Sequence, residues 1–211
     1  MEFYQFGSTG EVVKQIQKAL KLLPDGKFGL ETEKAVCAFQ REHRLKEDGI
    51  VGPATIAKLI HARMKRSKRT IKEIIVHCTA TKEGYDYTID DVRRWHTLPV
   101  ASGGRGWSDI GYHYLIGRHG ELWEGRDVDI QGAHCAEGGH NRFSIGVCYV
   151  GGLARDGKTP KDTRTLQQKA ALLKLLTDLK RTYPNAKIYN HGDFCAKACP
   201  SFNAREEYKN L

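Results

Sequence analysis

Two histidines and a cysteine carry the most distinctive chemistry in this chain of 211 residues. His191 and Cys199 lie close together after a short strand-like run, and His77 ends another apolar run far upstream. Two imidazoles and a thiolate can hold a catalytic zinc ion, which needs three protein ligands and a fourth position for water. Spacing alone favours a structural or surface role, because nine histidines are scattered over the chain.

Five short motifs follow one another between residues 71 and 211. They are IVHCTAT at 75–81, DIGYHY at 109–114, GAH at 132–134, SIGV at 144–147 and KACPSF at 197–202. Together they resemble the zinc-dependent N-acetylmuramoyl-L-alanine amidases of the peptidoglycan recognition protein superfamily, and most closely the phage lysozymes of that group. The resemblance implies a substrate, peptidoglycan, and a reaction, hydrolysis of the amide between N-acetylmuramic acid and L-alanine by a zinc-activated water.

The resemblance also assigns roles to individual residues. It implies zinc ligation by His77, His191 and Cys199 and catalytic roles for Tyr112 and Lys197. The lysine precedes the cysteine by two residues, so its ammonium can reach a developing oxyanion. An ordinary phenol has a pKa near 10, so we expect the tyrosine to orient the water, and to take its proton only if the metal lowers that pKa.

Two further residues are expected to contact the substrate. His134, in the GAH motif, resembles a histidine of the family's substrate groove, and Thr79 follows the expected ligand His77. Cys199 stands where related amidases use aspartate, which places the chain with the phage-lysozyme and recognition-protein branch. Superfamily members that lack this cysteine bind cell wall without cutting it.

The first third of the chain contains an internal repeat. The sequence DGKFG at 25–29 returns as DGIVG at 48–52, and each copy is followed by a threonine. Glycine allows the turn, and a helix follows each copy. Apolar spacing predicts helices at about 9–22, 31–43 and 53–63, with Leu23 on the apolar face of the first. This pattern is similar to the peptidoglycan-binding domains of wall hydrolases, and a groove near the two turns is our hypothesis for the polymer site.

The remainder is predicted to be a mixed α/β domain. We expect strands at 71–76 and 144–150, a helix at 88–96, a hairpin at 112–124 and a long helix at 166–183. Thr88 and either Thr163 or Thr165 are expected to cap the two helices. Five leucines should cover the sheet: Leu172, Leu173, Leu175, Leu176 and Leu179.

These segments predict an α+β multidomain protein. The expected domains are a peptidoglycan-binding helical domain at 1–62, a basic linker at 63–70 and a zinc amidase domain at 71–211. Residues 1–70 carry 14 Lys and Arg against 8 Asp and Glu, and residues 71–211 carry 20 against 17, which accounts for the net charge of +9. A basic balance favours an anionic polymer such as a cell wall.

The cysteines and the lack of long apolar segments indicate the redox state and the cellular location of the protein. Cys78 and Cys148 lie in apolar runs, so we expect buried free thiols and a reduced protein. No stretch predicts a membrane anchor or a secretory signal. We therefore expect a monomeric phage or prophage endolysin, made in the host cytoplasm and acting on the wall after release.

Three other functions remain open at this point. A non-catalytic recognition protein would bind wall without releasing stem peptides. A zinc peptidase would cut within the stem peptide and would not free the amine of L-alanine. A regulator would bind another protein, such as a phage polymerase, or nucleic acid. Only the basic run at 63–69 would support nucleic-acid binding, and we expect no nucleic-acid partner unless DNA binding is shown to depend on salt.

Overall fold

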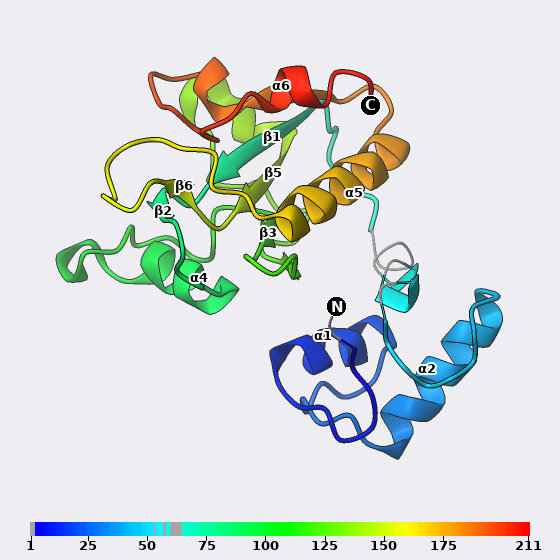
Figure 1. Cartoon of the computed structure of the whole chain (residues 1–211). Coiled ribbons are helices and arrows are strands. Elements are labelled where there is room, and N and C mark those ends of the chain that lie inside the picture. Colours follow the sequence, from blue (N-terminus) through cyan, green and yellow to red (C-terminus); the bar gives the residue numbers. More distant parts are fainter. Residues whose placement is uncertain (1–2, 53, 57, 60–64) are drawn as a thin grey trace. The chain divides into compact units, whose positions relative to one another are not determined.

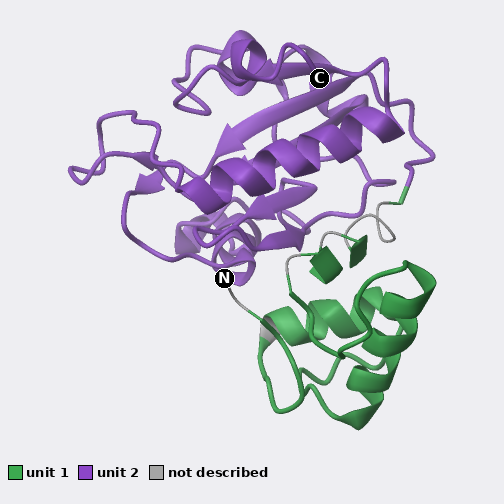
Figure 2. Cartoon of the chain, turned by 45° about the vertical axis from the view of Figure 1, so that its right-hand side comes forward, with its two compact units in different colours: residues 1–65 green, residues 66–211 purple. Residues whose placement is uncertain are grey.

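The chain divides into two compact units, residues 1–65 and 66–211, which Figure 2 colours separately. In the part of the chain that the structure describes, no helix is both long and apolar enough to cross a membrane. The computed structural model describes residues 3–52, 54–56, 58–59 and 65–211.

The first unit contains the helices α1 (Glu11–Ala19) and α2 (Leu30–Glu42). Of the third expected helix, residues 54–56 and 58–59 are helical, while 53, 57 and 60–63 lie outside the described residues. The helices and turns enclose a small apolar core. It consists of Val13, Ile16, Phe28, Val36, Phe39, Val51 and Leu59.

A buried glutamine organises each copy of the repeat. The Gln40 amide nitrogen donates to Asp48 Oδ1 at 3.0 Å, to the Ile50 carbonyl at 2.9 Å and to Thr55 Oγ1 at 3.1 Å. Gln17 makes the same three contacts one repeat earlier, to Asp25, Lys27 and Thr32. The two copies therefore share one hydrogen-bond pattern, which ties each Asp-Gly turn to the helix before it.

One apolar residue of the first helix lies where the periodicity does not place it. Leu23 is 84% exposed, so its expected place on the buried face is wrong. Helix α1 ends at Ala19, and Lys21 has a left-handed φ of 59°. The chain therefore turns before it reaches Leu23, and the helical period no longer decides which way that side chain points.

The second unit is built on a five-stranded sheet in the order β4-β3-β5-β1-β7 (Figure 1). Neighbouring strands run parallel except β3 and β4, which form the expected hairpin. The strands are β1 (Glu73–Cys78), β3 (Tyr114–Ile116), β4 (Leu122–Glu124), β5 (Ser144–Tyr149) and β7 (Lys187–Asn190). A second, two-stranded parallel sheet pairs β2 (Thr81–Lys82) with β6 (Gly152–Leu153).

Two helices with capping boxes pack against this sheet. Helix α4 (Ile89–Thr97) is capped by Thr88, as expected, and α5 (Leu166–Thr182) is capped by Thr165. Four of the five expected leucines of α5 are buried, at the i, i+3, i+4, i+7 spacing of one helix face. Leu173 falls outside that stripe and is half exposed, so its expected contact with the sheet is wrong.

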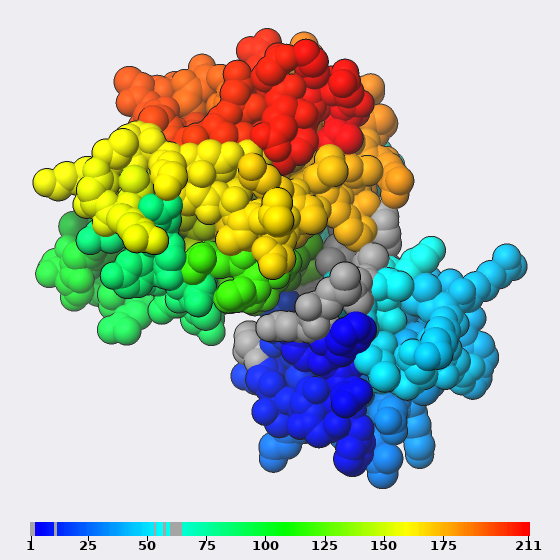
Figure 3. Space-filling model, viewed as in Figure 1, coloured from blue at the N-terminus to red at the C-terminus, as the bar shows by residue number. Residues whose placement is uncertain are grey.

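Short helical segments complete the second unit. They are η1 (Val100–Ser102), η2 (Glu137–Arg142), η3 (His191–Asp193) and α6 (Ala204–Glu207). On the face shown in Figure 3, the C-terminal segment lies against the stretch that precedes α5. The buried Arg164 guanidinium joins these segments through ion pairs with Asp162 and Glu207, both at 2.8 Å, and lies over the Phe202 ring. This contact fixes the C-terminal segment just beyond Cys199.

Part of the expected basic linker belongs to the second unit. The Ser67 amide donates to the Tyr183 hydroxyl at 2.6 Å, and Ser67 Oγ donates to the Val128 carbonyl at 2.7 Å. The Arg69 guanidinium donates to five backbone carbonyls, those of Val128, Ile130, Asn141, Arg142 and Ser144. Residues 63 and 64 of the expected linker lie outside the described residues.

Candidate active site

The sheet brings the two expected ligand histidines side by side. β1 and β7 are parallel neighbours, and Val76 pairs with Asn190, so His77 and His191 follow at the same edge. His77 is also in register with Cys148, on the sheet face that α4 covers. Its side chain is 1% exposed and that of His191 is 7% exposed.

Cys199 completes this cluster from the C-terminal segment. Its Sγ lies 3.9 Å from His77 Nδ1, and one ligand atom from each of the three residues lies within 4.8 Å of the others. The Tyr149 hydroxyl holds the next residue, donating to the Pro200 carbonyl at 2.7 Å. Gly192 and Cys199 close the loop between them, because the Gly192 amide donates to the Cys199 carbonyl at 2.7 Å.

The donor atoms of this cluster fit a zinc ion. Among the described residues, His191 Nε2 is buried and has no hydrogen-bond partner, which a bound cation would correct. Its nearest acidic group, Glu137 Oε2, is 3.8 Å away, too far for a hydrogen bond. Two imidazole nitrogens and a sulfur form a donor set that zinc accepts, with a position left over.

Burial controls the protonation of the cluster. It lowers the pKa of His77 well below the usual value, and the neighbouring His134 and His191 lower it further. Burial and then the Lys197 ammonium also lower the pKa of His191. Both imidazoles are therefore neutral near pH 7, as metal ligands must be. The adjoining Cys78 thiol and burial raise the pKa of Cys199, so binding a cation there releases a proton.

The two expected catalytic residues differ in burial and in the groups that they contact. The Tyr112 ring centroid is 5.2 Å from that of His77, and burial raises the pKa of the phenol well above its usual value. Lys197 is mostly exposed, and its Nζ lies 3.9 Å from Glu137 Oε1. The tyrosine thus presents a protonated hydroxyl, whereas the lysine presents an exposed ammonium group.

Comparison with known proteins identifies the family. Residues 67–202 match the N-acetylmuramoyl-L-alanine amidase family, and residues 9–59 match a peptidoglycan binding domain. The chain belongs to the N-acetylmuramoyl-L-alanine amidase family. The second unit is therefore an amidase, peptidoglycan is its substrate, and the expected α+β fold class is confirmed.

Individual relatives agree with this assignment. The amidase is 40% identical to the endolysin of Enterobacteria phage K11 over 149 residues, which are 70% of this chain and 93% of that one. It is 28% identical to a peptidoglycan-recognition protein of Drosophila melanogaster over 155 residues, 71% of this chain and 79% of that one. The solved endolysin amidase LysCS from Clostridium intestinale superposes with a TM-score of 0.53 at 26% identity, covering 67% of this chain and 83% of that one.

A hollow of about 390 Å³ opens beside Cys199 in the amidase unit. It runs from the end of β7 to the C-terminal segment. Its lining consists of Pro160, Asn190, Gly192, Asp193, Lys197, Ala198, Cys199, Ser201, Phe202 and Asn203. Because Lys197 and Cys199 both line it, a substrate in this hollow would lie next to the ligand cluster.

The two expected substrate contacts stay predictions. The Thr79 hydroxyl accepts from the Gly151 amide at 2.9 Å and lies 2.8 Å from Thr81 Oγ1. His134 is buried, at 8% exposure, and both of its ring nitrogens have partners in the described residues. Its Nδ1 lies 3.0 Å from His77 Nε2, a contact that sequence reasoning did not anticipate.

Sequence reasoning also missed two neighbours of the cluster. Glu137 comes from a glycine-rich segment with no local pattern, yet it lies beside both His191 and Lys197. Cys78 was expected to be a buried free thiol, which it is, but its amide also points at Cys199 Sγ, 3.4 Å away. The adjacency of Cys78 to the ligand His77 was the available signal.

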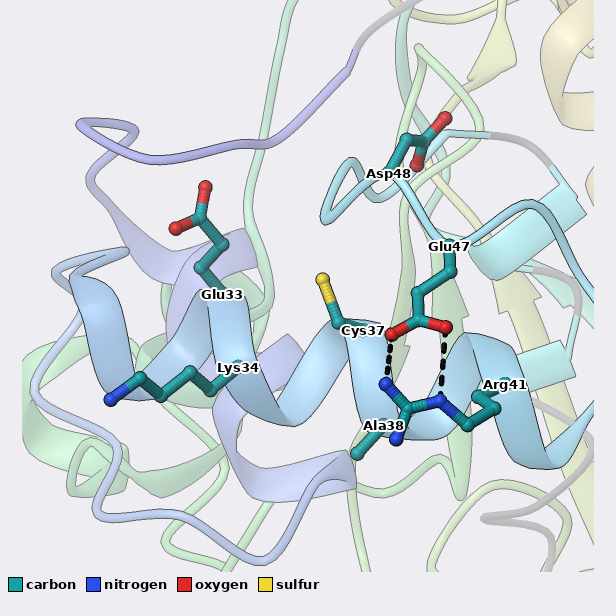
Figure 4. A pocket seen from close by; sticks show the side chains of 7 residues that line it. All are labelled: Glu33, Lys34, Cys37, Ala38, Arg41, Glu47 and Asp48. Atoms are coloured by element: carbon teal, nitrogen blue, oxygen red, sulfur yellow. Dashed lines mark hydrogen bonds and ion pairs between the residues drawn. The ribbon is translucent and has the colours of Figure 1, made fainter.

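In the first unit, a hollow of about 380 Å³ lies beside the second Asp-Gly turn. Figure 4 shows its lining, in which the Arg41 guanidinium pairs with the Glu47 carboxylate. The other lining residues are Glu33, Lys34, Cys37, Ala38 and Asp48. This is the region in which the sequence hypothesis places the polymer site.

Proposed function

We propose that His77, His191 and Cys199 hold a zinc ion on which the amidase reaction depends. The observation that carries this proposal is the convergence of one ligand atom from each of the three residues within 4.8 Å of one another, together with a buried His191 Nε2 that has no partner among the described residues. When bound there, zinc would supply a Lewis acid and lower the pKa of water toward about 7. Two neutral imidazoles and one thiolate suit it, and they leave a position open.

Lys197 supplies the positive charge that amide hydrolysis needs at the oxyanion. Its ammonium sits on the closed loop that precedes Cys199, and the hollow beside that loop can hold the scissile carbonyl. Glu137 Oε1 lies 3.9 Å from Lys197 Nζ, and its negative charge attracts the ammonium toward the part of the site that contains His191. A cation positioned where negative charge develops typically lowers the barrier by about 3 to 4 kcal/mol.

Tyr112 orients the attacking water by donating or accepting a hydrogen bond through a phenol that stays protonated. Burial raises the pKa of this hydroxyl, so proton abstraction by the phenolate is unfavourable. His134 and Thr79 remain our proposed contacts along the groove.

The first unit is proposed to hold the amidase on its polymer. Residues 1–65 carry net charge +3, as 11 basic against 8 acidic residues, which suits an anionic cell wall. The K11 relative is named an endolysin. We accordingly propose a phage or prophage endolysin that acts as a monomer on the bacterial wall after release from the cytoplasm, with no nucleic-acid partner.

Product analysis tests this function and separates its rivals. Purified wall is digested, and the newly formed amine termini are identified by mass spectrometry. We expect L-alanine termini from the native chain and from Cys195→Ser, and none from Cys199→Ser. Termini of another stem-peptide residue would indicate a peptidase, and the absence of any release by the native chain would indicate a recognition protein.

A further inference from the structure

A chain of hydrogen bonds runs from the ligand cluster into the core of the second unit. His77 Nε2 lies 3.0 Å from His134 Nδ1, and His134 Nε2 lies 3.3 Å from Ser144 Oγ. Ser144 Oγ in turn donates to the backbone carbonyl of His140 at 2.7 Å. His77, His134 and Ser144 are all buried.

The carbonyl at the end of this chain determines where each proton lies. A carbonyl only accepts, so the single hydroxyl proton of Ser144 points to His140, and Ser144 Oγ accepts from His134 Nε2. The neutral His134 ring then has a lone pair on Nδ1, which accepts a proton from His77 Nε2. His77 is left with its lone pair on Nδ1, the nitrogen that faces Cys199 Sγ at 3.9 Å.

The surrounding backbone encloses the His134 ring closely. A Cβ added at Gly146 would lie 2.4 Å from His134 Cδ2, and one at Gly132 would lie 2.5 Å from the same atom. Asn141 Oδ1 accepts from the backbone amides of His134 and Cys135 at 2.9 and 2.8 Å. Close packing against Gly132 and Gly146 therefore fixes the ring, and the hydrogen bonds to Asn141 fix the backbone that carries it. A positioning residue must be fixed in this way.

We propose that His134 is a positioning residue that holds His77 in the tautomer with its proton on Nε2 and its lone pair on Nδ1, ready to bind the metal. The inference rests on the proposed function, because it takes His77 as a zinc ligand. Partners of this kind typically change metal affinity about 10- to 100-fold. This role is additional to the substrate contact proposed above for the same residue.

Zinc affinity of the whole chain provides the first test. The dissociation constant is measured by competition with a chromophoric chelator for the native chain, His134→Leu, His134→Asn and the control His96→Leu. We expect about 10- to 100-fold weaker binding for His134→Leu. His134→Asn should recover most of the affinity, because its amide oxygen can accept where Nδ1 does. His96→Leu replaces another buried histidine, whose Nδ1 accepts from the Gly111 amide at 3.1 Å, and should bind zinc normally.

Nitrogen NMR of the metal-free chain provides the second test and needs no folded variant. We expect the His77 ring to be protonated on Nε2 and not on Nδ1, and the His134 ring likewise. A His77 ring protonated on Nδ1 would overturn the proposal, as would a zinc affinity of His134→Leu within about twofold of native, since the expected loss is at least tenfold. If the native chain itself binds no zinc, the proposed function fails, and the NMR result still reports on the hydrogen-bond chain.

Discussion

Replacing Gln40 with alanine should strongly destabilise the first unit while leaving the amidase unit intact. The Gln40 side chain is 1% exposed and makes five hydrogen bonds, three from its amide nitrogen and two to its oxygen from the amides of Asp48 and Gly49. Each such bond contributes about 1 kcal/mol net, and the three shared by one nitrogen contribute less. We therefore expect Gln40→Ala to cost about 3 kcal/mol.

This loss is large for so small a unit. A domain of about 65 residues rarely has more than about 3 to 5 kcal/mol of stability. Hydrogen-exchange mass spectrometry of the full chain measures the effect locally, since exchange of core amides reports the free energy of opening. Amides of α2 should exchange about a hundredfold faster in Gln40→Ala, because about 1.4 kcal/mol corresponds to a factor of ten.

The second unit and a variant on the exposed side of α2 provide the controls for this experiment. Helix α5 lies in the second unit, so its amides should keep their native exchange rates. The rate at which the chain hydrolyses a soluble muropeptide should also stay at the native value. Binding to insoluble wall should fall. Lys34→Ala, a change on the outer side of the same helix, should leave α2 protection unchanged. Native-like protection of α2 in Gln40→Ala, or equal loss in α5, would refute the reasoning.

Three further predictions concern the second unit. Lys197→Ala should retain zinc, measured by metal analysis, but lose turnover roughly a hundredfold or more. A chain that begins at residue 71 should melt about 6 to 12 °C below one that begins at residue 66, because it lacks about 3 kcal/mol of hydrogen bonds from Ser67 and Arg69. Burial, with Arg105 and Arg126, lowers the pKa of His96 to about 4, against about 6.5 when unfolded. Its stabilising contribution is thus full above about pH 6.5 and is lost as pH falls through about 4, and calorimetric unfolding of His96→Gln should show a weaker pH dependence.

The ligand cluster could be anticipated because its residues lie in motifs, while Glu137 and the contact between His134 and His77 could not. His77 and Cys199 are far apart in sequence, and only the pairing of β1 with β7 places His77 beside His191. Glu137 and His134 reach the cluster through loops whose path depends on tertiary contacts, so no local period marks them. Their roles depend on distances that a one-dimensional pattern does not contain.

The errors in the predicted fold also arise because tertiary structure overrides a local pattern. Leu23 continues an apolar period after the helix has ended, so the pattern assigned it to a face that no longer exists. Leu173 is apolar but lies off the buried stripe of α5. Arg69 lies in a run of charged residues, and such runs are usually solvated. Its guanidinium is instead surrounded by backbone carbonyls of the second unit. Capping boxes, by contrast, are local, and Thr88 was identified correctly.

The most direct test of the central claim is digestion of purified wall before and after removal of metal. The chain is stripped with a chelator, assayed for release of stem peptides with L-alanine termini, and assayed again after one equivalent of zinc is restored. The proposed site predicts that release stops on stripping and returns with zinc in the native chain, and that it does not return in Cys199→Ser. A metal-free chain that still digests wall at the native rate would contradict the account.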